Sequence, residues 1–350
     1  MLKGVRIVGS GLIGTSIALA LKARGVQVQM VDSDLSAQRL ARDLVGESDV
    51  SQPDVVVFAL PSSQLSLVIE GEYALNPNST FMDVGSIKTE VVLEVAKSSL
   101  PLERFVPTHP MAGREVGGAQ SARADLFVAR SWVITPTAEC LPEAITLAAE
   151  VITACGADLI SLPVDEHDRA VAVVSHLPQI LSSLLAQGLQ GVQNGWLDLA
   201  GGGLRDMTRI AGSDAQLWSE IIFSNREPIA ALIKAMHQSL GELYENLDDK
   251  EFIRDFIQSG NTGKSRIPGK HGGQARDYSY LPIVIDDKPG QLAAIFNECA
   301  KISVNVEDLS IEHSPGQLSA LITLSLSQKD ALELSAHLSA IGWNVHPIQK

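Results

Sequence analysis

The chain is poor in cationic residues: it has 27 Lys and Arg against 41 Asp and Glu, a formal net charge of −14. Such an acidic surface disfavours nonspecific binding to nucleic acid or to an anionic membrane. Cations that hold an anionic ligand must then be concentrated locally, which makes clustered arginines informative. The composition is otherwise that of a globular protein, since 45% of the residues are hydrophobic and 19% are charged.

Cysteines and long apolar runs are also scarce. The three cysteines, Cys140, Cys155 and Cys299, have neither CxxC spacing nor the spacing of metal ligands. The N-terminus has no signal-peptide layout, and no apolar run is predicted to reach transmembrane length. We therefore expect a reduced, cytoplasmic protein with no metal site and no membrane or nucleic-acid partner.

A glycine-rich turn follows the first predicted strand, Val5–Val8. Apolar residues then recur at helical spacing as far as Gly25. In this context Gly9 allows the tight turn, Gly11 lets a pyrophosphate approach the backbone, and Gly14 lets the helix pack close to the sheet. The pattern indicates a dinucleotide-binding fold, and the alternative is a glycine-rich turn that binds no nucleotide.

The second predicted strand, Val26–Val31, ends at Asp32. A carboxylate there accepts hydrogen bonds from the ribose hydroxyls and repels a 2′-phosphate, so NAD is favoured over NADP. Arg39 and Arg42 lie farther along and could soften this preference, but Asp32 is placed to decide it. The apolar run Asp54–Leu60 is the third strand, whose loop should pass the nicotinamide. The predicted cofactor-binding residues are Gly9, Gly11, Leu12, Ile13, Gly14, Asp32, Leu60, Pro61 and Ser86.

Two further strand ends place polar residues where a site is expected. The apolar runs Thr80–Met82 and Arg104–Val106 each break into glycine, proline and polar residues, among them Ser86 and His109. Loops at the carboxyl ends of parallel strands form the ligand crevice of an open α/β sheet. We expect Ser86 and His109 to face one crevice, where a hydroxyl and an imidazole can move a proton. The alternative is that His109 is structural.

The sheet is expected to be completed by strands Ser131–Ile134 and Asp158–Leu162, with helix Leu141–Cys155 between them. Helical periodicity dominates from Asp165, and Pro178 should kink or restart the helix. Two capping boxes, Ser213-x-x-Gln216 and Asp248-x-x-Glu251, predict further helix starts. The broad apolar faces fit either a dimer interface or a monomeric core.

Arginines gather after the glycine run Gly201–Gly203. Arg205 and Arg209 are four residues apart, so on one helix they share a face, and an anionic ligand would relieve their repulsion. Alternatively, the neighbouring carboxylate of Asp206 offsets the repulsion between the two arginines.

The C-terminal part begins with a glycine-rich, basic segment, Ser259–Asp277, which is predicted to be a linker. Strands and helices then follow in the order βαββαβ from Tyr280 to Pro347. The turn from Asp286 to Leu292 resembles the start of an ACT domain, a regulatory module that commonly binds amino acids. A structural role without a ligand is the alternative.

Four blocks in fixed order support a wider resemblance. They are Asp83-Val84-Gly85-Ser86-Ile87-Lys88, His109-Pro110-Met111-Ala112-Gly113-Arg114-Glu115, Val173-Val174-Ser175-His176-Leu177-Pro178-Gln179 and Gly201–Ala211. Together with the dinucleotide fold, the set resembles the prephenate/arogenate dehydrogenase family of tyrosine biosynthesis. The resemblance implies NAD-dependent oxidation of a cyclohexadienyl ring with loss of CO₂, and a homodimer.

The resemblance also implies roles for single residues. His109 would accept a hydrogen bond from the substrate hydroxyl, with Ser86 as its hydrogen-bonding partner, and Arg209 would bind a carboxylate. Glu115 would pair with Arg209 and gate the site. The predicted substrate-binding set is Arg209, His176, Gln179, Arg205, Arg114 and Glu115.

Gln179 departs from the family's pattern, which has histidine there, and Arg114 often aligns with a small polar residue. Both leave the choice between prephenate and arogenate open. The remaining histidines, including His167, are expected to be solvent-facing or structural.

The predicted organisation is a Rossmann-type NAD-binding domain at 1–163, a helical substrate and dimerisation domain at 164–258, the linker at 259–277, and an ACT-like ferredoxin-like domain at 278–350. The predicted function is prephenate dehydrogenase with L-tyrosine as a possible effector. Alternatives are an arogenate or dual-specificity cyclohexadienyl dehydrogenase, another NAD-dependent hydroxyacid dehydrogenase, and a non-catalytic protein that senses NAD and amino acids.

Overall fold

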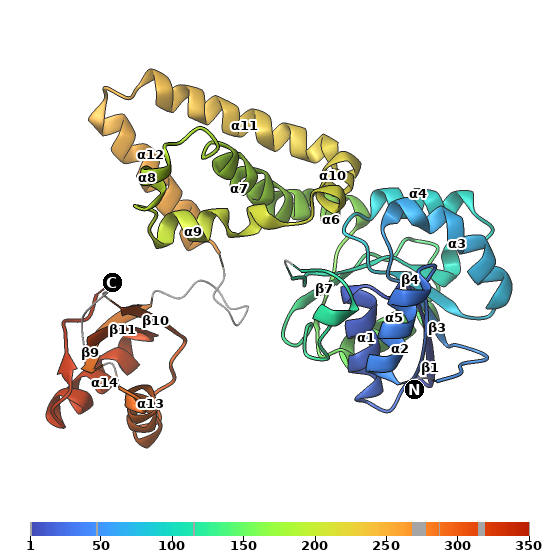
Figure 1. The fold of residues 1–350 in the computed structure, drawn as a ribbon, viewed down its shortest axis with the longest axis horizontal. Coiled ribbons are helices and arrows are strands. Elements are labelled where there is room, and N and C mark those ends of the chain that lie inside the picture. Colours follow the sequence, from blue (N-terminus) through green and yellow to red (C-terminus); the bar gives the residue numbers. More distant parts are fainter. Residues whose placement is uncertain are drawn as a thin grey trace. The chain divides into compact units, whose positions relative to one another are not determined.

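The computed structural model describes residues 2–46, 48–114, 116–267, 278–286, 288–313 and 319–349 (Figure 1). The chain divides into two compact units, Met1–Ser239 and Leu240–Lys350. The first unit combines an α/β part and a helical part, and each unit is described by itself below.

A five-stranded parallel sheet forms the centre of the α/β part. Its order is β2-β1-β3-β4-β5, the Rossmann-type arrangement that the glycine-rich turn predicts. All five predicted strands are present, within a few residues of their expected bounds. They are β1 (Gly4–Val8), β2 (Gln27–Val31), β3 (Val55–Phe58), β4 (Thr80–Asp83) and β5 (Phe105–Val106).

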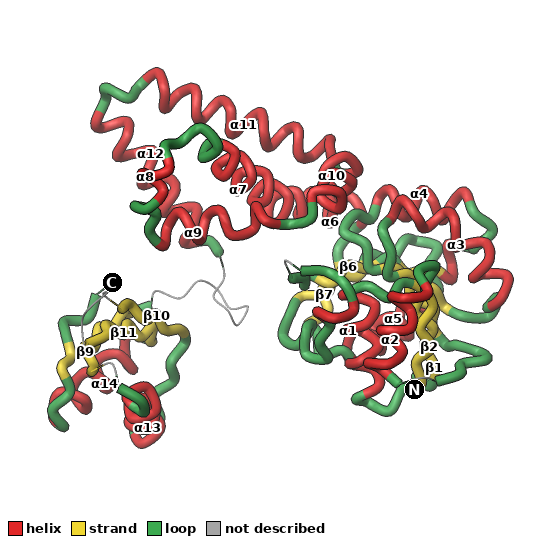
Figure 2. The backbone as a smooth tube through the Cα atoms, viewed as in Figure 1, coloured by secondary structure: helices red, strands yellow, loops and turns green. Residues whose placement is uncertain are grey.

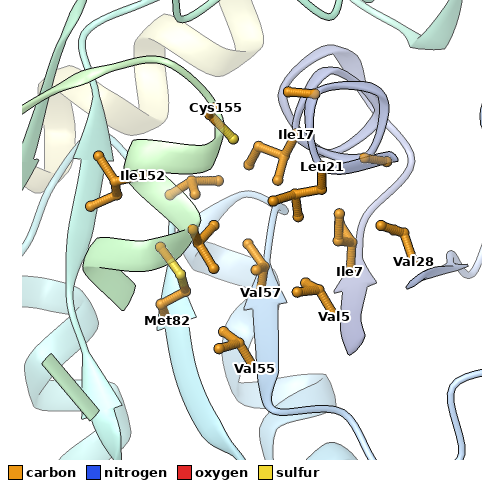
Figure 3. Packing of buried hydrophobic residues seen from close by; sticks show 14 of the residues in the cluster. Val5, Ile7, Ile17, Leu21, Val28, Val55, Val57, Met82, Ile152 and Cys155 are labelled. Carbon is orange, nitrogen blue, oxygen red and sulfur yellow. The ribbon is translucent and has the colours of Figure 1, made fainter. Parts of the chain in front are cut away.

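Helices cover this sheet and close its core. Figure 3 shows Ile7 of β1 and Val57 of β3 packing with Ile17 and Leu21 of α1, near Ile152 of α5. These side chains are fully buried, as expected for parallel strands covered on both faces. The helices are α1 (Leu12–Lys22), α2 (Leu35–Val45), α3 (Ser62–Leu75), α4 (Thr89–Lys97) and α5 (Pro142–Ala154).

The prediction that later strands complete this sheet is wrong. Strands β6 (Thr108–Pro110), β7 (Ser131–Ile134) and β8 (Asp158–Ser161) form a separate three-stranded sheet. Strand β5 has only two residues, and Pro107 and Pro110 lack the N–H groups that a continuing ladder requires. The chain therefore turns after β5, and β6 pairs antiparallel with β7. His109 consequently lies in a short strand instead of the predicted loop.

A long helical segment begins the helical part. Helix α6 (Val164–Val171) continues through a π-turn, η3 (Ala172–His176), into α7 (Leu177–Gln187). Pro178 falls in the first turn of α7, where a missing N–H costs little. The helix is therefore irregular near Pro178, as predicted, but the irregularity is a π-turn that ends just before the proline.

This segment, Val164–Gln187, has the length and composition of a membrane-spanning helix, although only 33% of its apolar window is buried. The prediction that no such run exists is therefore wrong. The segment nevertheless includes the buried polar residues His167, Asp168 and His176, which hydrogen-bond within the same unit. Buried polar groups with protein partners are typical of the core helix of a globular protein.

The rest of the helical segments are α8 (Asn194–Leu197), α9 (Gly202–Thr208), the 3₁₀ turn η4 (Arg209–Gly212), α10 (Ala215–Ser224), α11 (Arg226–Glu245) and α12 (Lys250–Ser265). In both predicted capping boxes, the residue that caps the helix is one position later than predicted. The Asp214 carboxylate accepts from the Leu217 N–H, and Asp249 caps α12. Because α12 continues to Ser265, the start of the predicted linker is helical, and residues 268–277 lie outside the described part.

The last part of the second unit, residues 279–349, contains a four-stranded antiparallel sheet and the helices α13 and α14 (Figure 2). Its strand order is β10-β11-β9-β12, and Ile283, Ile322, Leu324 and Leu334 are among its fully buried core residues. The element order follows the predicted βαββαβ pattern. The elements are β9 (Ser279–Asp286), α13 (Gln291–Lys301), β10 (Asp308–His313), β11 (Ser319–Leu326), α14 (Gln328–Ala340) and β12 (Asn344–Val345).

Candidate functional site

The glycine-rich turn has the geometry of a nucleotide-binding loop. Gly9 has a φ of +114°, and a Cβ there would lie 2.2 Å from the Ala59 carbonyl oxygen. A Cβ on Gly14 would lie 2.1 Å from the Gly9 carbonyl oxygen, so this glycine permits the close approach of α1. A Cβ on Gly11, by contrast, would meet no atom within 4 Å. Gly11 therefore borders open space at the start of α1, where free N–H groups favour phosphate.

Asp32 lies beside this loop, as predicted. One oxygen of its carboxylate accepts the Ser10 N–H at 2.6 Å, and the other accepts the Asp34 N–H at 2.8 Å. These bonds fix the carboxylate at the end of β2, and each oxygen keeps a second lone pair. The loop and the carboxylate thus fit the pyrophosphate and the ribose of a dinucleotide.

Two substitutions separate the packing role of Gly14 from the binding role of Gly11. Gly14→Ala is expected to destabilise the fold by about 1–3 kcal/mol, because the backbone must shift to admit a methyl group. Gly11→Ala should leave the melting temperature unchanged but raise the Kd for NAD about 10-fold by blocking the close approach of phosphate. Thermal unfolding and NAD titration test both expectations. A Gly11→Ala protein that binds NAD normally would contradict this role for Gly11.

Asp83, at the end of β4, organises the turn that contains Ser86. Its carboxylate accepts from the Gly85 N–H at 2.8 Å and from the Thr108 N–H at 3.2 Å, and it pairs with the Lys88 ammonium. Lys88 is fully buried and also donates to the Thr108 carbonyl oxygen at 2.6 Å. Burial lowers the pKa of Lys88, and the charge of Asp83 opposes that shift. These contacts fasten the strand that contains His109 to the turn after β4.

His109 contacts a residue for which the sequence had suggested no role. Its Nδ1 lies 2.9 Å from Nε2 of His167, and Nδ1 of His167 lies 2.8 Å from Oδ1 of Asp168. Asp168 in turn accepts the main-chain N–H groups of Lys88 and Thr89 at 2.9 and 2.8 Å. His109, His167 and Asp168 are all buried, so helix α6 supplies the hydrogen-bonded support of the candidate base.

His167 was predicted to be solvent-facing or structural; the solvent-facing alternative is wrong, because His167 is buried and bonded to His109 and Asp168. In the described part of the chain, the hydrogen-bond partner of His109 is His167, and Ser86 makes no hydrogen bond to it. Ser86 is half-buried in the turn before Lys88, on the same segment. The sequence signal for His167 is only the adjacent pair His167-Asp168, which is also common on exposed helices.

Electrostatics keep the imidazole of His109 neutral. Burial lowers its pKa well below the ordinary value, and the neighbouring His167, Lys88 and His176 lower it further, while Asp168 acts in the opposite direction. Burial alone would raise the pKa of Asp168, but hydrogen bonds from His167, Thr89 and the Lys88 main chain lower it to about 2. A neutral imidazole beside an ionised carboxylate is suited to act as a base.

His176 is buried, unlike an open ligand-binding side chain. Its Nδ1 accepts from the Asn225 side-chain amide at 3.0 Å, and its ring meets Trp218 edge-on at 6.0 Å. Burial lowers the pKa of His176 to about 4. Asn225 also donates to the Asp168 carbonyl oxygen at 2.8 Å, so His176 is linked to the helix that supports His109.

Gln179 is hydrogen-bonded to the turn that begins with Arg209. Its side-chain amide donates to the Ile210 carbonyl oxygen at 2.9 Å, and its side-chain oxygen accepts from the Ser213 hydroxyl at 3.4 Å. Only 5% of Gln179 is exposed. Gln179 therefore holds the turn η4 against α7.

The predicted cationic residues lie at the surface. Arg205 is in α9 and Arg209 begins η4, so the two do not share one continuous α-helix as predicted. Arg114 donates to the Ser121 carbonyl oxygen at 3.0 Å, within the loop after β6. Glu115 lies outside the described residues. An open hollow of about 520 Å³ beside α7, lined by Ser183, Gln187 and Ala211 among others, contains none of the predicted site residues.

No cluster of metal-ligating side chains occurs among the residues that the structure describes, so the site rests on the nucleotide loop and the buried histidines. The nucleotide loop and His109 can bring a dinucleotide and a neutral base to the same end of a parallel sheet.

Comparisons with known proteins agree with this arrangement. Residues 17–161 match the family model described as prephenate dehydrogenase, nucleotide-binding domain, and residues 163–257 match its dimerization domain. A probable prephenate dehydrogenase of Streptomyces niveus is 29% identical, covering 96% of this chain and 98% of that protein. A cyclohexadienyl dehydrogenase of Zymomonas mobilis is 30% identical over 77% of this chain and 97% of its own length.

Among solved structures, the prephenate dehydrogenase of Aquifex aeolicus in complex with hydroxyphenyl propionate and NAD⁺ is similar. It is 27% identical, with a TM-score of 0.67, over 75% of this chain and 96% of that chain. The two matched ranges include Asp32, His109, His167 and Arg209, and they begin after the Gly9–Gly14 turn. This chain belongs to the prephenate dehydrogenase family.

Proposed function

We propose that this protein uses NAD to oxidise prephenate, with loss of CO₂, to 4-hydroxyphenylpyruvate. The observation that supports this most is the buried, neutral His109 held by His167 and Asp168. Bound NAD would supply the hydride acceptor, held by the Gly9–Gly14 loop and Asp32. Loss of CO₂ then makes the ring aromatic, so the protein mainly positions the ring and accepts the hydroxyl proton.

Prephenate is preferred over arogenate as the proposed substrate because Gln179 is neutral and already hydrogen-bonded to the turn of Arg209. The side-chain amide of Gln179 has no negative charge that would attract the amino group that arogenate has in place of the keto group of prephenate. An arogenate or dual-specificity enzyme is the second candidate, supported by the similarity to a cyclohexadienyl dehydrogenase.

The test is to incubate the purified protein with NAD and either prephenate or arogenate, and to follow NADH absorbance. Turnover of prephenate alone supports the proposal, and turnover of arogenate alone supports the second candidate. A protein that forms NADH with neither substrate would contradict the enzymatic function and favour the sensing protein.

We propose in addition that the protein acts as a cytoplasmic homodimer through its helical part. Large apolar side chains are exposed on α7, α9 and α10: Leu184, Met207 and Phe223 are 55%, 60% and 69% exposed. Exposed large apolar side chains on three helices of one part favour an interface that covers them. The match of residues 163–257 to a dimerization domain supports the same assignment.

We propose that the last part of the second unit, predicted at residues 278–350, is an ACT-like, ferredoxin-like domain that senses L-tyrosine. Its strand order supports this fold, and a hollow of about 330 Å³ lies beside the end of β9, lined by residues that include Asp286, Gln291 and Trp343. A carboxylate, an amide and an aromatic ring offer suitable contacts for an amino acid.

Removing residues 268–350 should abolish inhibition by L-tyrosine while activity remains, because coupling between two sites requires both of them. The chain should end after Ile267, since α12 extends to Ser265. Initial rates of the full-length and shortened proteins, measured over a range of L-tyrosine concentrations, test this expectation. Equal inhibition of both proteins, competitive with prephenate, would instead place the L-tyrosine site in the substrate pocket.

A further inference from the structure

The hydrogen bonds that join His109, His167 and Asp168 have one possible direction while both rings are neutral. The ionised Asp168 carboxylate only accepts, so Nδ1 of His167 must donate to it. A neutral imidazole has one donor nitrogen, and Nε2 of His167 is therefore an acceptor. It receives the Nδ1–H of His109, which leaves Nε2 of His109 with a free lone pair.

The carboxylate at the end of this chain is fixed in place. Oδ1 of Asp168 also accepts from the main-chain N–H of Lys88, and Oδ2 accepts from that of Thr89, at the start of α4. Hydrogen bonds from main-chain donors at a helix start favour the ionised form of a carboxylate. Asp168 is thus a buried, permanent negative charge near the end of a chain of two imidazoles.

We infer that His109, His167 and Asp168 form a proton relay. Nε2 of His109 takes the proton of the substrate hydroxyl, and Nδ1 of His109 passes its own proton to Nε2 of His167. This inference rests on the proposed function, because it takes a ring hydroxyl as the proton donor. His167 and Asp168 do not touch the substrate and act through His109.

The relay balances in protons and electrons. The substrate O–H bond breaks as an N–H bond forms at Nε2 of His109, and one N–H bond moves from His109 to His167. The two electrons and the hydrogen of the C4–H bond leave as hydride to NAD, and the oxygen forms a double bond to C4. His109 ends neutral with its other nitrogen protonated, and the positive charge lies on His167 in contact with Asp168.

Charge placement gives the physical reason for the second transfer. The ionisable groups that act on His109 are His167, Lys88, His176 and Asp168, and Asp168 alone favours a cation there. A positive charge on His109 would be separated from Asp168 by the whole ring of His167. On His167 the same charge lies 2.8 Å from the Asp168 oxygen, and the Lys88 ammonium is already paired with Asp83.

The test compares His167→Gln and Asp168→Asn with Asp165→Asn, an exposed acid on the same helix that pairs with Arg169. Glutamine at 167 offers an oxygen to the Nδ1–H of His109 but does not accept a proton. We expect kcat to fall about 10-fold in the first two variants, less than the loss of a direct general base, because His109 remains. Asp165→Asn should behave as the unmodified protein.

The pH profile distinguishes a relay from a merely structural role. In a relay, the proton of the pair lies on His167 beside Asp168. Removing His167 leaves the buried His109 as the base that titrates, and removing the carboxylate withdraws the charge that favours a cation at His109. The acid limb of kcat/KM should therefore move to lower pH in both variants. An acid limb that stays in place in His167→Gln would overturn the relay. If Asp168→Asn fails to fold, His167→Gln alone decides.

Nitrogen-15 NMR of the imidazoles gives a readout that needs no turnover. In the unmodified protein we expect His109 to be protonated at Nδ1 and unprotonated at Nε2. A proton on Nε2 of His109 would overturn the inference even in an active enzyme. A protein with the expected protonation that fails to oxidise prephenate would instead contradict the proposed function and leave the hydrogen-bond direction intact.

Discussion

His109→Asn is expected to lower kcat with prephenate by about 10²-fold or more, since general acid–base catalysis contributes on that order. Asparagine keeps a polar side chain of similar reach, but its amide is not a base at neutral pH. The affinity for NAD should barely change, because the nucleotide loop Gly9–Gly14 and Asp32 are separate from β6. Steady-state rates and NAD titration of the same preparation measure the two quantities.

His337→Asn is the matched control for this experiment. His337 lies in the C-terminal unit and contacts Glu298 at 2.9 Å, so its loss should leave kcat unchanged. A His109→Asn protein with undiminished kcat would remove His109 from the chemistry. Equal loss of NAD binding and of kcat would instead indicate that the substitution disrupts the fold around β6.

Arg209→Ala is expected to raise KM for prephenate by about 10²-fold with a smaller effect on kcat. A charge-assisted hydrogen bond to a carboxylate contributes about 1.5–3 kcal/mol, and bidentate geometry suits a guanidinium. Arg209 is exposed at the start of η4, where Gln179 braces the turn, so it is placed to meet a ligand. Initial rates over a range of prephenate concentrations give both constants.

Arg169→Ala is the control for the arginine experiment, because Arg169 is an exposed partner of Asp165 in the same unit. Its KM should equal that of the unmodified protein. If KM of Arg209→Ala stays within about twofold, the carboxylate is bound elsewhere, since the loss of a charge-assisted contact has a larger effect. Arg205 and Arg114 would then be the next residues to test.

Local patterns allowed the nucleotide-binding half to be predicted from sequence. The Gly9–Gly14 turn, its flanking strand and helix, and Asp32 are close in sequence, and sterics dictate their geometry. The apolar run of β3 likewise identified a strand buried on both faces. These features depend on near neighbours, so the sequence alone is enough to place them.

The support of His109 was not predictable in the same way. His167 lies 58 residues away in the chain and reaches His109 only because α6 packs beside α4. A buried histidine on an amphipathic helix has the same local pattern as an exposed one, and its partner belongs to another element. The separate sheet of β6, β7 and β8 was missed for the related reason that strand pairing is non-local.

The helix starts show the limit of local patterns. Ser213 and Asp248 had the spacing of capping boxes, yet Asp214 and Asp249 are the residues that accept main-chain hydrogen bonds. Adjacent polar residues can cap a helix equally well, and the packing of the helix decides between them.

The most direct test of the proposed function is the reaction of the unmodified protein with NAD and prephenate, followed by NADH absorbance and by identification of the product. The expected result is one NADH and one CO₂ for each 4-hydroxyphenylpyruvate formed, with this activity reduced by about 10²-fold in His109→Asn. Absence of NADH with a folded, NAD-binding protein would contradict the account.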